Sequence, residues 1–354
     1  MGVVALVGTR KGLFLLRADD GRRSWQAEGP LLDGWGVYHA IVDERDGTIY
    51  AAANHLVYGA TVQRSMDGGT SWKRSQQIAL PEQSGLRVNA TWCVRPGRPG
   101  EPGTVYLGGD PAFLCRSEDG GETWEANRGI LEHPTRERWP PSRGGLMLHC
   151  IQLDPSDDQR MYVAISGGGT FRTDDGGATW AAKNKDVEFD LVPDPYPEVG
   201  QCVHKLLLHP ARPEQLWQQN HCGVYRSDDR GDSWERLDGN GLPGPFGFTI
   251  MLDPADPDVA VVIPEKAYEY HYTVDGLGVY RTPDGGHTWE RMTHGLPDEA
   301  WAAVLREASA FDSESMYFGT QSGSFFALTN GDRWVEGVRN LPPILSIEVT
   351  PWSG

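Results

Sequence analysis

Short hydrophobic runs alternate with polar turns along the whole chain. In one stretch, the runs at residues 146–153, 160–166 and 170–173 are each followed by a turn rich in Asp, Gly or Pro, and a fourth run begins at Trp180. Runs this short that end in turn residues predict β-strands, because amphipathic helices need longer stretches with a period near 3.6 residues. The stretch therefore predicts four consecutive antiparallel strands, here named strands A to D.

The same pattern recurs, with a tryptophan at the start of each strand D. These tryptophans are 45 to 56 residues apart and are Trp25, Trp72, Trp124, Trp180, Trp234, Trp289 and Trp334. A four-stranded sheet cannot bury both of its faces alone, so repeats of this kind stack around an axis. The sequence therefore predicts an all-β fold, a seven-bladed β-propeller with four antiparallel strands per blade.

The two ends of the chain predict how the ring closes. The run PPILSIEVTP at residues 342–351 resembles a strand A, but no strand B, C or D follows it. The N-terminal runs VVALVG and LFLLR, and the run from Trp25, supply the three missing strands. We expect residues 1–30 to complete the blade begun by residues 342–351, which leaves no free sheet edge. Residues 1–354 are then expected to form a single propeller domain.

A turn rich in Asp and Gly precedes most of these tryptophans, as in RSEDGGETW from Arg116 to Trp124. Close copies span residues 65–72, 173–180, 227–234 and 282–289. Successive glycines permit positive φ, and the Asp carboxylate can accept backbone N–H bonds across the turn. We expect each turn to bury its indole against the neighbouring blade. Calcium binding is the alternative, although each turn carries fewer carboxylates than a calcium loop needs. Three turns depart from this pattern and are expected to be looser. They carry Arg22 or Arg230 in place of a glycine, or are one residue short, as at Asn330.

The turn resembles the Asp-box, or BNR, repeat Ser-x-Asp-x-Gly-x-Thr-Trp, and the resemblance covers nearly the whole chain. Proteins with this repeat include sialidases, xyloglucan-cleaving glycosidases and the photosystem II stability/assembly factor type. The resemblance therefore implies either a sialidase-like glycosyl hydrolase or a non-catalytic scaffold. Sialidase activity itself is disfavoured, because the chain contains no Arg-Ile-Pro motif.

Composition and charge narrow the range of partners. The formal net charge of −17 disfavours nucleic acid and anionic membrane surfaces, which select clustered Lys and Arg. No apolar segment reaches a membrane-spanning length, and the N-terminal run MGVVALVGTR is typical of a strand, not of a signal peptide. Five cysteines without a disulfide-framework spacing predict a cytoplasmic protein. We expect a small-molecule or glycan ligand, with a protein partner as a further option.

Strand direction places the Asp-Gly turns on one face and the starts of strands A, with the ends of strands B, on the other. The second face also receives long loops at residues 133–145, 183–200 and 265–278, whose Pro and Tyr side chains predict the walls of a binding cleft. The predicted substrate-binding residues are Arg10, His39, His55, Arg87, Asn89, Asn220, Tyr268 and His271.

Histidines gather on this second face. Neutral imidazole binds metal ions and titrates near neutral pH, so His149, His204 and His221 are candidate ligands of a divalent metal ion. If the two strands pair so that the numbers of opposed residues sum to about 424, Cys202 lies opposite Cys222. The two cysteines would then be buried structural residues, with a disulfide or a site for a soft metal ion as the alternatives.

A glycoside hydrolase needs two carboxyl groups, one protonated and one charged. The acids expected on the second face are Asp110, Glu198, Glu265 and Glu269. The predicted catalytic residues are Asp110, Glu265 and His204. The sequence thus predicts a carbohydrate-active hydrolase or lyase with its site at the channel mouth. The alternative is a binding or assembly scaffold.

Overall fold

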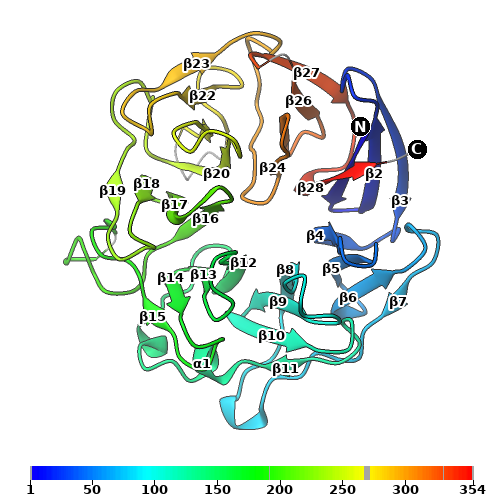
Figure 1. The fold of residues 1–354 in the computed structure, drawn as a ribbon, viewed down its shortest axis with the longest axis vertical. Coiled ribbons are helices and arrows are strands. Elements are labelled where there is room, and N and C mark those ends of the chain that lie inside the picture. The colour runs from blue at the N-terminus through cyan, green and yellow to red at the C-terminus, as the bar shows by residue number, and fades with distance from the viewer. Residues whose placement is uncertain (1, 191, 267–271, 330, 353–354) are drawn as a thin grey trace.

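The computed structural model describes residues 2–190, 192–266, 272–329 and 331–352. Within these residues, seven four-stranded antiparallel sheets form a ring around a central axis (Figure 1). We number the blades around the ring, starting from the one that contains both chain ends. The expected seven-bladed propeller with four strands per blade is confirmed.

The first four blades have the following strands, from the axis outward. Blade 1 contains β28 (Ile344–Trp352), β1 (Gly2–Thr9), β2 (Gly12–Ala18) and β3 (Trp25–Leu31). Blade 2 contains β4 (Gly36–Val42), β5 (Ile49–His55), β6 (Gly59–Ser65) and β7 (Lys73–Arg74). Blade 3 contains β8 (Ala90–Pro96), β9 (Val105–Asp110), β10 (Phe113–Ser117) and β11 (Glu125–Ala126). Blade 4 contains β12 (Met147–Leu153), β13 (Met161–Ser166), β14 (Gly169–Thr173) and β15 (Ala181–Ala182).

The other three blades repeat this order. Blade 5 contains β16 (Val203–His209), β17 (Arg212–Asn220), β18 (Gly223–Ser227) and β19 (Glu235–Arg236). Blade 6 contains β20 (Gly247–Leu252), β21 (Ala260–Pro264), β22 (Val279–Thr282) and β23 (Glu290–Met292). Blade 7 contains β24 (Ser309–Phe311), β25 (Met316–Gly319), β26 (Phe325–Thr329) and β27 (Arg333–Val338). The described helices are short: η1 (Glu82–Ser84), α1 (Arg128–Leu131) and η2 (Arg136–Arg138). None of them is long and apolar enough to cross a membrane.

Both chain ends build blade 1, as the sequence predicts. Strand β28 pairs antiparallel with β1 from Gly2 opposite Trp352 to Gly8 opposite Ser346. The two termini consequently lie side by side in Figure 1. This pairing joins the two ends of the chain within blade 1 and so closes the ring.

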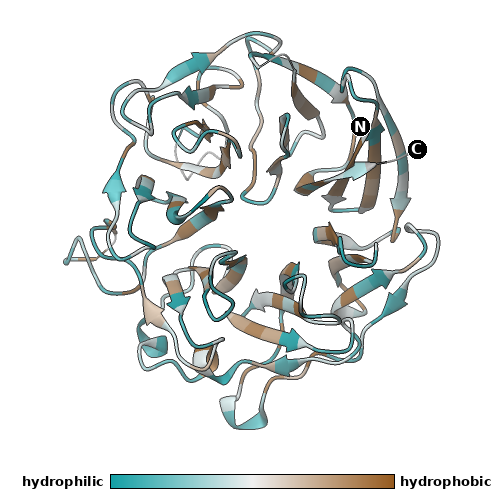
Figure 2. Ribbon diagram, viewed as in Figure 1, coloured by the Kyte–Doolittle hydropathy of each residue, from teal (hydrophilic) through white to brown (hydrophobic). Residues whose placement is uncertain are grey.

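The hydrophobic core lies within and between the blades. Every residue of β13 is buried, whereas both residues of β7 at the outer rim are exposed. Figure 2 shows hydrophobic residues on the inner strands and hydrophilic colour on outer strands such as β19 and β23. Large side chains join neighbouring blades, as where Trp25 of blade 1 packs against Phe325 of blade 7 with ring centroids 4.8 Å apart.

Side-chain hydrogen bonds hold the Asp-Gly turns together. In the first full copy, Gly69 N–H donates to Ser65 Oγ at 2.8 Å and Ser71 N–H donates to Asp67 Oδ1 at 2.9 Å. The hydrogen bonds from Ser71 lower the pKa of Asp67 to about 2. The same pattern recurs in the turns headed by Ser117, Thr173, Ser227 and Thr282.

The turns that carry Arg230 and Arg22 in place of glycine are held by different side-chain contacts, and their expected looseness stays a prediction. Arg230 adopts φ 62° in place of glycine, and Ser233 N–H still donates to Asp229 Oδ1 at 2.9 Å. Arg22 is buried, and its Nε donates to Tyr317 Oη of blade 7 at 2.6 Å. The turn of Arg230 therefore keeps the hydrogen bond to its Asp, whereas Arg22 ties its turn to blade 7. Asn330 lies outside the described residues.

Several indoles bind the preceding blade, as expected. Trp234 Nε1 donates to Lys183 O at 2.8 Å, and Trp289 Nε1 donates to Leu237 O at 2.7 Å. Each bond reaches the loop that leaves the blade before. The Asp-Gly turn thus stabilises its own blade and its contact with the neighbour.

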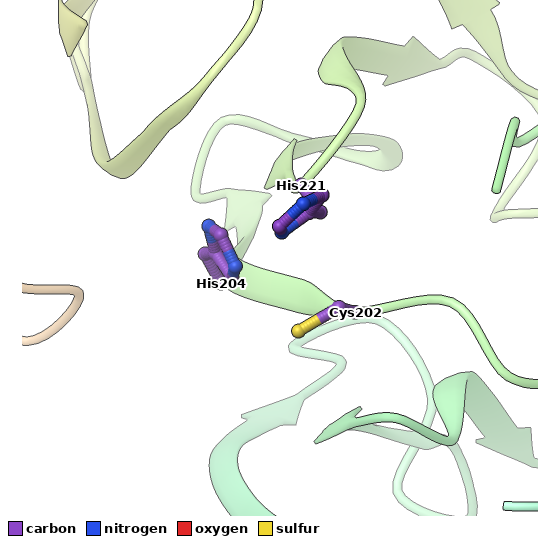
Figure 3. Close-up of side chains that lie close together, drawn as sticks. All are labelled: Cys202, His204 and His221. Atoms are coloured by element: carbon purple, nitrogen blue, oxygen red, sulfur yellow. The ribbon is translucent and has the colours of Figure 1, made fainter. Parts of the chain in front are cut away.

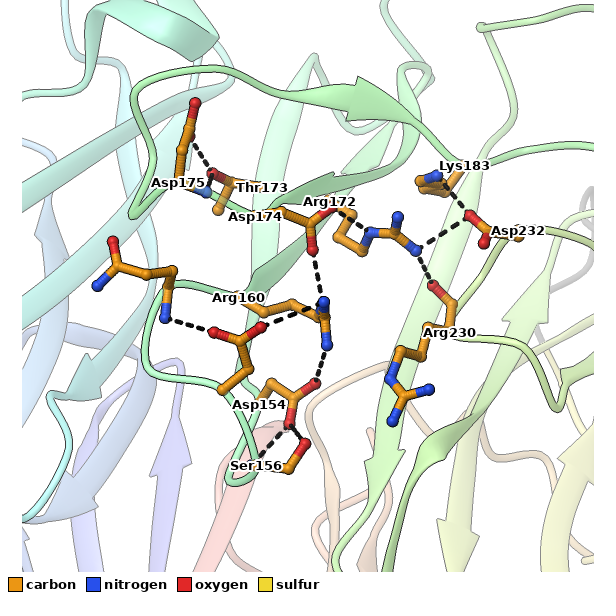
Figure 4. A network of polar contacts seen from close by, with 12 residues as sticks. Asp154, Ser156, Arg160, Arg172, Thr173, Asp174, Asp175, Lys183, Arg230 and Asp232 are labelled. Atoms are coloured by element: carbon orange, nitrogen blue, oxygen red, sulfur yellow. Dashed lines mark hydrogen bonds and ion pairs between the residues drawn. The ribbon is translucent and has the colours of Figure 1, made fainter.

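Arginines on the third strands link these turns around the ring. Arg172 of blade 4 donates to Arg230 O at 2.9 Å and to Asp232 at 3.0 Å in the turn of blade 5, where Lys183 also reaches Asp232 at 2.5 Å (Figure 4). Arg64 and Arg226 make the equivalent bond to the next turn, to Gly120 O and Gly285 O, both at 2.9 Å. This face is therefore held by contacts between turns, and we call it the turn face.

Candidate functional site

The opposite face carries the starts of the inner strands and the ends of the second strands. Asn89 N–H donates to Asp110 O at 2.9 Å, and His221 N–H donates to Cys202 O at 3.0 Å, which ties the two strand ends together in blades 3 and 5. Because the strands of each blade run antiparallel, these ends lie away from the Asp-Gly turns. We call this the mouth face.

Six inner strands carry one extra residue at the same level, close to the mouth face. The strand register shifts by one residue at Leu345, Tyr38, Trp92, His149, His204 and the pair Phe248–Thr249. A β-bulge redirects its side chain and is common beside functional sites. We call Leu345, Tyr38, Trp92, His149, His204 and Phe248 the mouth ring.

Arg306 of blade 7 connects opposite sides of this ring. Its guanidinium carbon lies 5.6 Å from the ring centroid of Trp92 in blade 3 and 5.2 Å from that of Phe248 in blade 6. Tyr38 packs edge-on against Trp92, with centroids 4.9 Å apart. Burial lowers the pKa of Arg306, and no residue in the described ranges forms a salt bridge with its guanidinium. Aromatic faces and one cation thus meet at the mouth, a combination suited to polar ring-shaped ligands.

Below the mouth ring lies a cavity of about 280 Å³ on the axis. The inner elements of all seven blades line it, through His39, Cys93, His149, Lys205, Ile250, Glu307 and Glu348, among others. Lys205 Nζ and Glu307 Oε2 lie 2.5 Å apart, and His39 Nε2 lies 3.1 Å from Glu348 Oε1. Burial opposes ionisation of Glu307, but Lys205 and His149 hold its pKa well below the ordinary range. Both carboxylates are therefore charged and paired, and neither is suited to donate a proton.

Glu265 has the opposite electrostatic character. It lies at the end of β21 and is 1% exposed. Burial raises its pKa to about 8, although a hydrogen bond from Val304 N–H and the charge of Arg306 act in the other direction. A carboxyl group that keeps its proton at neutral pH can act as a general acid.

The structure separates the other predicted catalytic residues. His204 is buried in blade 5, where its Nδ1 lies 2.6 Å from Gly247 O, and burial holds its pKa well below the usual value. Asp110 is half-buried in blade 3, where it accepts a bond from Asn89 Nδ2 at 3.3 Å, and desolvation raises its pKa. Asp110 and Glu265 lie three blades apart.

The described members of the predicted substrate-binding set lie in several blades. His39 lies inside the axial cavity, and Asn220 is buried. His55 packs on Trp35 and Tyr58 at the turn between β5 and β6 of blade 2, with centroid distances of 5.1 and 4.7 Å. Exposed positions on the mouth face are Arg10, Arg87 and Asn89. Tyr268 and His271 lie outside the described residues.

A second cavity, of about 530 Å³, lies beside the loop expected to supply an aromatic wall. Tyr272 and Trp301 line it, with their rings edge to face at 5.1 Å, and Lys266 Nζ lies 5.7 Å from the Tyr272 centroid. Trp301 is 80% exposed. This outer cavity is a separate location for a ligand on the same face.

The candidate metal ligands are only partly brought together. His204 and His221 approach with ring centroids 5.7 Å apart, and Cys202 joins them (Figure 3). His149 instead lies with Nε2 2.9 Å from Val203 O and Nδ1 3.9 Å from Glu307. The sequence analysis grouped Cys202 with His204 and His221 but missed Arg306. Arg306 lies on the chain segment that leads into β24, and its position at the start of an inner strand is the signal that could have identified it.

The expected pairing of Cys202 with Cys222 is wrong at the strand end. Residue numbers sum to 424 from Lys205 opposite Gln219 onward, but the bulge at His204 shifts the register, so that Val203 opposes Asn220. Cys202 therefore faces His221. All five cysteines are free. The cytoplasmic location predicted from them stays a prediction.

No protein-family model matches the chain. A probable oligoxyloglucan-reducing end-specific xyloglucanase from Neosartorya fischeri is 24% identical over 202 residues, which cover 55% of this chain and 23% of that protein. The solved GH74 xyloglucanase from Xanthomonas campestris matches with a TM-score of 0.66 at 17% identity, over 95% of this chain and 52% of that chain. YCF48 bound to D1 peptide matches with a TM-score of 0.52 at 14% identity, over 88% and 83% of the two chains.

The matches thus cover about half the length of the solved xyloglucanase and less than a quarter of the fungal one. At these identities, the structural matches establish the fold. The expected resemblance to xyloglucan-cleaving glycosidases and to the assembly-factor type of propeller is confirmed.

Proposed function

We propose that this propeller is a carbohydrate-active hydrolase with its site at the mouth face and Glu265 as the proton donor. The observation that carries the proposal is the burial of the Glu265 carboxyl group, which is 1% exposed beside the mouth-face end of β21 and whose pKa burial raises to about 8. Glycoside cleavage needs such a group to protonate the leaving oxygen. The similarity to xyloglucanases supports the same class of substrate.

The mouth ring would bind the sugar. Tyr38 and Trp92 are partly exposed, and aromatic faces stack against the apolar faces of sugar rings. Arg306 lies over Trp92 and would hydrogen-bond to ligand oxygens through its fork of N–H donors. Asp110 remains the predicted second carboxylate, on the other side of the ring.

The test is release of reducing ends from xyloglucan oligosaccharides and from a panel of neutral and acidic glycosides. Glu265→Gln keeps the size of the side chain but cannot donate the proton, and loss of general acid catalysis should slow cleavage about 10²- to 10⁴-fold. Glu198→Gln is the matched control, because Glu198 lies on the same face but is 60% exposed and paired with Arg138. Cleavage by Glu265→Gln at the parent rate, or no cleavage of any glycoside by the parent, would reject the assignment.

A non-catalytic scaffold is the second candidate. The turn after β5 exposes Leu56 completely and Val57 at 76%, beside the ring stack of Trp35 and Tyr58. An apolar turn of this kind suits contact with a protein, and YCF48 has been solved bound to a peptide. A Leu56→Ser, Val57→Ser double variant that loses a protein partner, in a parent without glycosidase activity, would favour this alternative.

A further inference from the structure

We propose that Cys202, His204 and His221 form a binding site for one zinc-class divalent metal ion at the mouth face of blade 5. One ligand atom from each side chain lies within 4.8 Å of the other two. In a tetrahedral zinc site, Zn–S and Zn–N bonds of about 2.3 and 2.0–2.1 Å would set these atoms about 3.3–3.6 Å apart. Small rotations of the three side chains would therefore close the site around an ion.

The backbone already holds the three residues in place. His221 N–H donates to Cys202 O at 3.0 Å, which fixes the two residues on facing strand ends. The bulge at His204 turns the third side chain to the same place (Figure 3). Rigid strands that converge on one point suit metal ligation better than a mobile loop.

The hydrogen bond of His204 selects the coordinating nitrogen. Its Nδ1 lies 2.6 Å from Gly247 O, and since a carbonyl only accepts, Nδ1 carries the proton. Nε2 is then the nitrogen with a free lone pair. Metal-binding histidines commonly donate the other ring N–H to a backbone carbonyl in this way.

The surroundings suit a thiolate and two neutral imidazoles. Phe246 lies against both imidazoles, with centroid distances of 5.4 Å to His204 and 5.2 Å to His221, and Phe248 covers His204 at 4.6 Å. Arg306 lies over the Phe248 ring, with its guanidinium carbon 5.2 Å from the ring centroid. Arg306 repels a cation, but the thiolate reduces the charge of the bound ion. One sulfur and two nitrogens select the zinc class over calcium or magnesium.

Three protein ligands leave one tetrahedral position open, toward the partly exposed side of His221. A water molecule or a ligand oxygen would occupy it. This site shares His204 with the mouth ring but does not include Glu265, so metal binding is measured separately from glycosidase activity.

Cobalt binding tests the site directly. Untagged full-length protein, stripped with a chelator, is titrated with Co²⁺ and then with Zn²⁺. We expect one equivalent of Co²⁺ to produce tetrahedral d–d bands and a thiolate charge-transfer band, both abolished by Zn²⁺. Cys202→Ser should remove the charge-transfer band, and His221→Ala should weaken binding at least about tenfold. Cys222→Ser and His55→Ala are the controls, because Cys222 bonds to Asp190 and His55 packs on Trp35 at the β5–β6 turn of blade 2.

Thiol labelling tests the unmodified protein. Cys202 is partly exposed and the other four cysteines are buried. A coordinated thiolate reacts slowly, so Zn²⁺ should slow alkylation of Cys202 at least about tenfold. Labelling that Zn²⁺ leaves unchanged would overturn the proposal, as would cobalt bands that persist in both Cys202→Ser and His221→Ala.

Discussion

Lys205 and Glu307 form a buried ion pair, with Nζ 2.5 Å from Oε2, although they are 102 residues apart in the chain. Their side chains are 8% and 9% exposed. Lys205 belongs to blade 5 and Glu307 to blade 7, so the pair crosses the axial cavity past blade 6. The centre of the ring is therefore tied by charge as well as by packing.

Removing one partner of this pair should be costly. Glu307→Gln leaves Lys205 charged in the cavity, and we expect the free energy of unfolding to fall by about 3–5 kcal/mol. Urea unfolding followed by tryptophan fluorescence measures the change.

The control is a double variant, Lys205→Met with Glu307→Gln, which removes both charges and should regain much of the loss. Glu198→Gln, which breaks an exposed pair with Arg138, should change stability by less than about 1 kcal/mol. A double variant as unstable as Glu307→Gln would show that the charge of Lys205 is not the cause.

Glu265 should make stability fall as the pH rises. Burial raises its pKa from an ordinary value of 4.5 to about 8 in the folded protein, so the folded state binds the proton more tightly than the unfolded chain. The stabilisation is complete below pH 4.5 and is lost as the pH rises through about 8. Relative to Glu265→Gln, the parent should lose on the order of a few kcal/mol over this interval. The measurement is the free energy of unfolding of parent and variant at several pH values. A difference between the two proteins that stays constant from pH 4.5 to about 8 would contradict the prediction.

The Asp-Gly turns should lose strength in acid. Hydrogen bonds from Thr179 lower the pKa of Asp175 to about 2, so this carboxylate stabilises the fold above its ordinary pKa of 3.8 and stops doing so as the pH falls through about 2. Asp175→Ala should lower the Tm at pH 7 by roughly 2–4 °C. The Tm difference from the parent should shrink toward pH 2, as measured by calorimetry. A difference that is equal at both pH values would assign the effect to something other than the charge.

Trp92 and Trp301 distinguish the two cavities of the mouth face. If the ligand binds at the mouth ring, Trp92→Ala should weaken oligosaccharide binding by about 1–2 kcal/mol, or roughly five- to thirtyfold, because its aromatic face is lost. Trp301→Ala alters only the outer cavity and should leave affinity unchanged. Isothermal titration calorimetry with xyloglucan oligosaccharides measures both, and the reverse pattern would move the site to the outer cavity.

The candidate site could be predicted only in part. Strand direction placed His204, His221 and Glu265 on the mouth face, because antiparallel order follows from the repeat. It could not place Arg306 between Trp92 and Phe248, since that contact joins three blades across the axis. It also could not foresee the bulge at His204, which changes the partner of Cys202.

The sequence by itself determined the ring. The ring could be predicted from the spacing of the tryptophans, the Asp-Gly turns and the division of one blade between the two chain ends. These features depend on contacts within a blade or between neighbouring blades, so each is visible as a pattern in the order of residues. Only the tertiary structure decided which buried groups are charged, protonated or brought together at the axis. Their pKa values and contacts depend on side chains from blades far apart in the chain, where small register shifts and burial decide the energy.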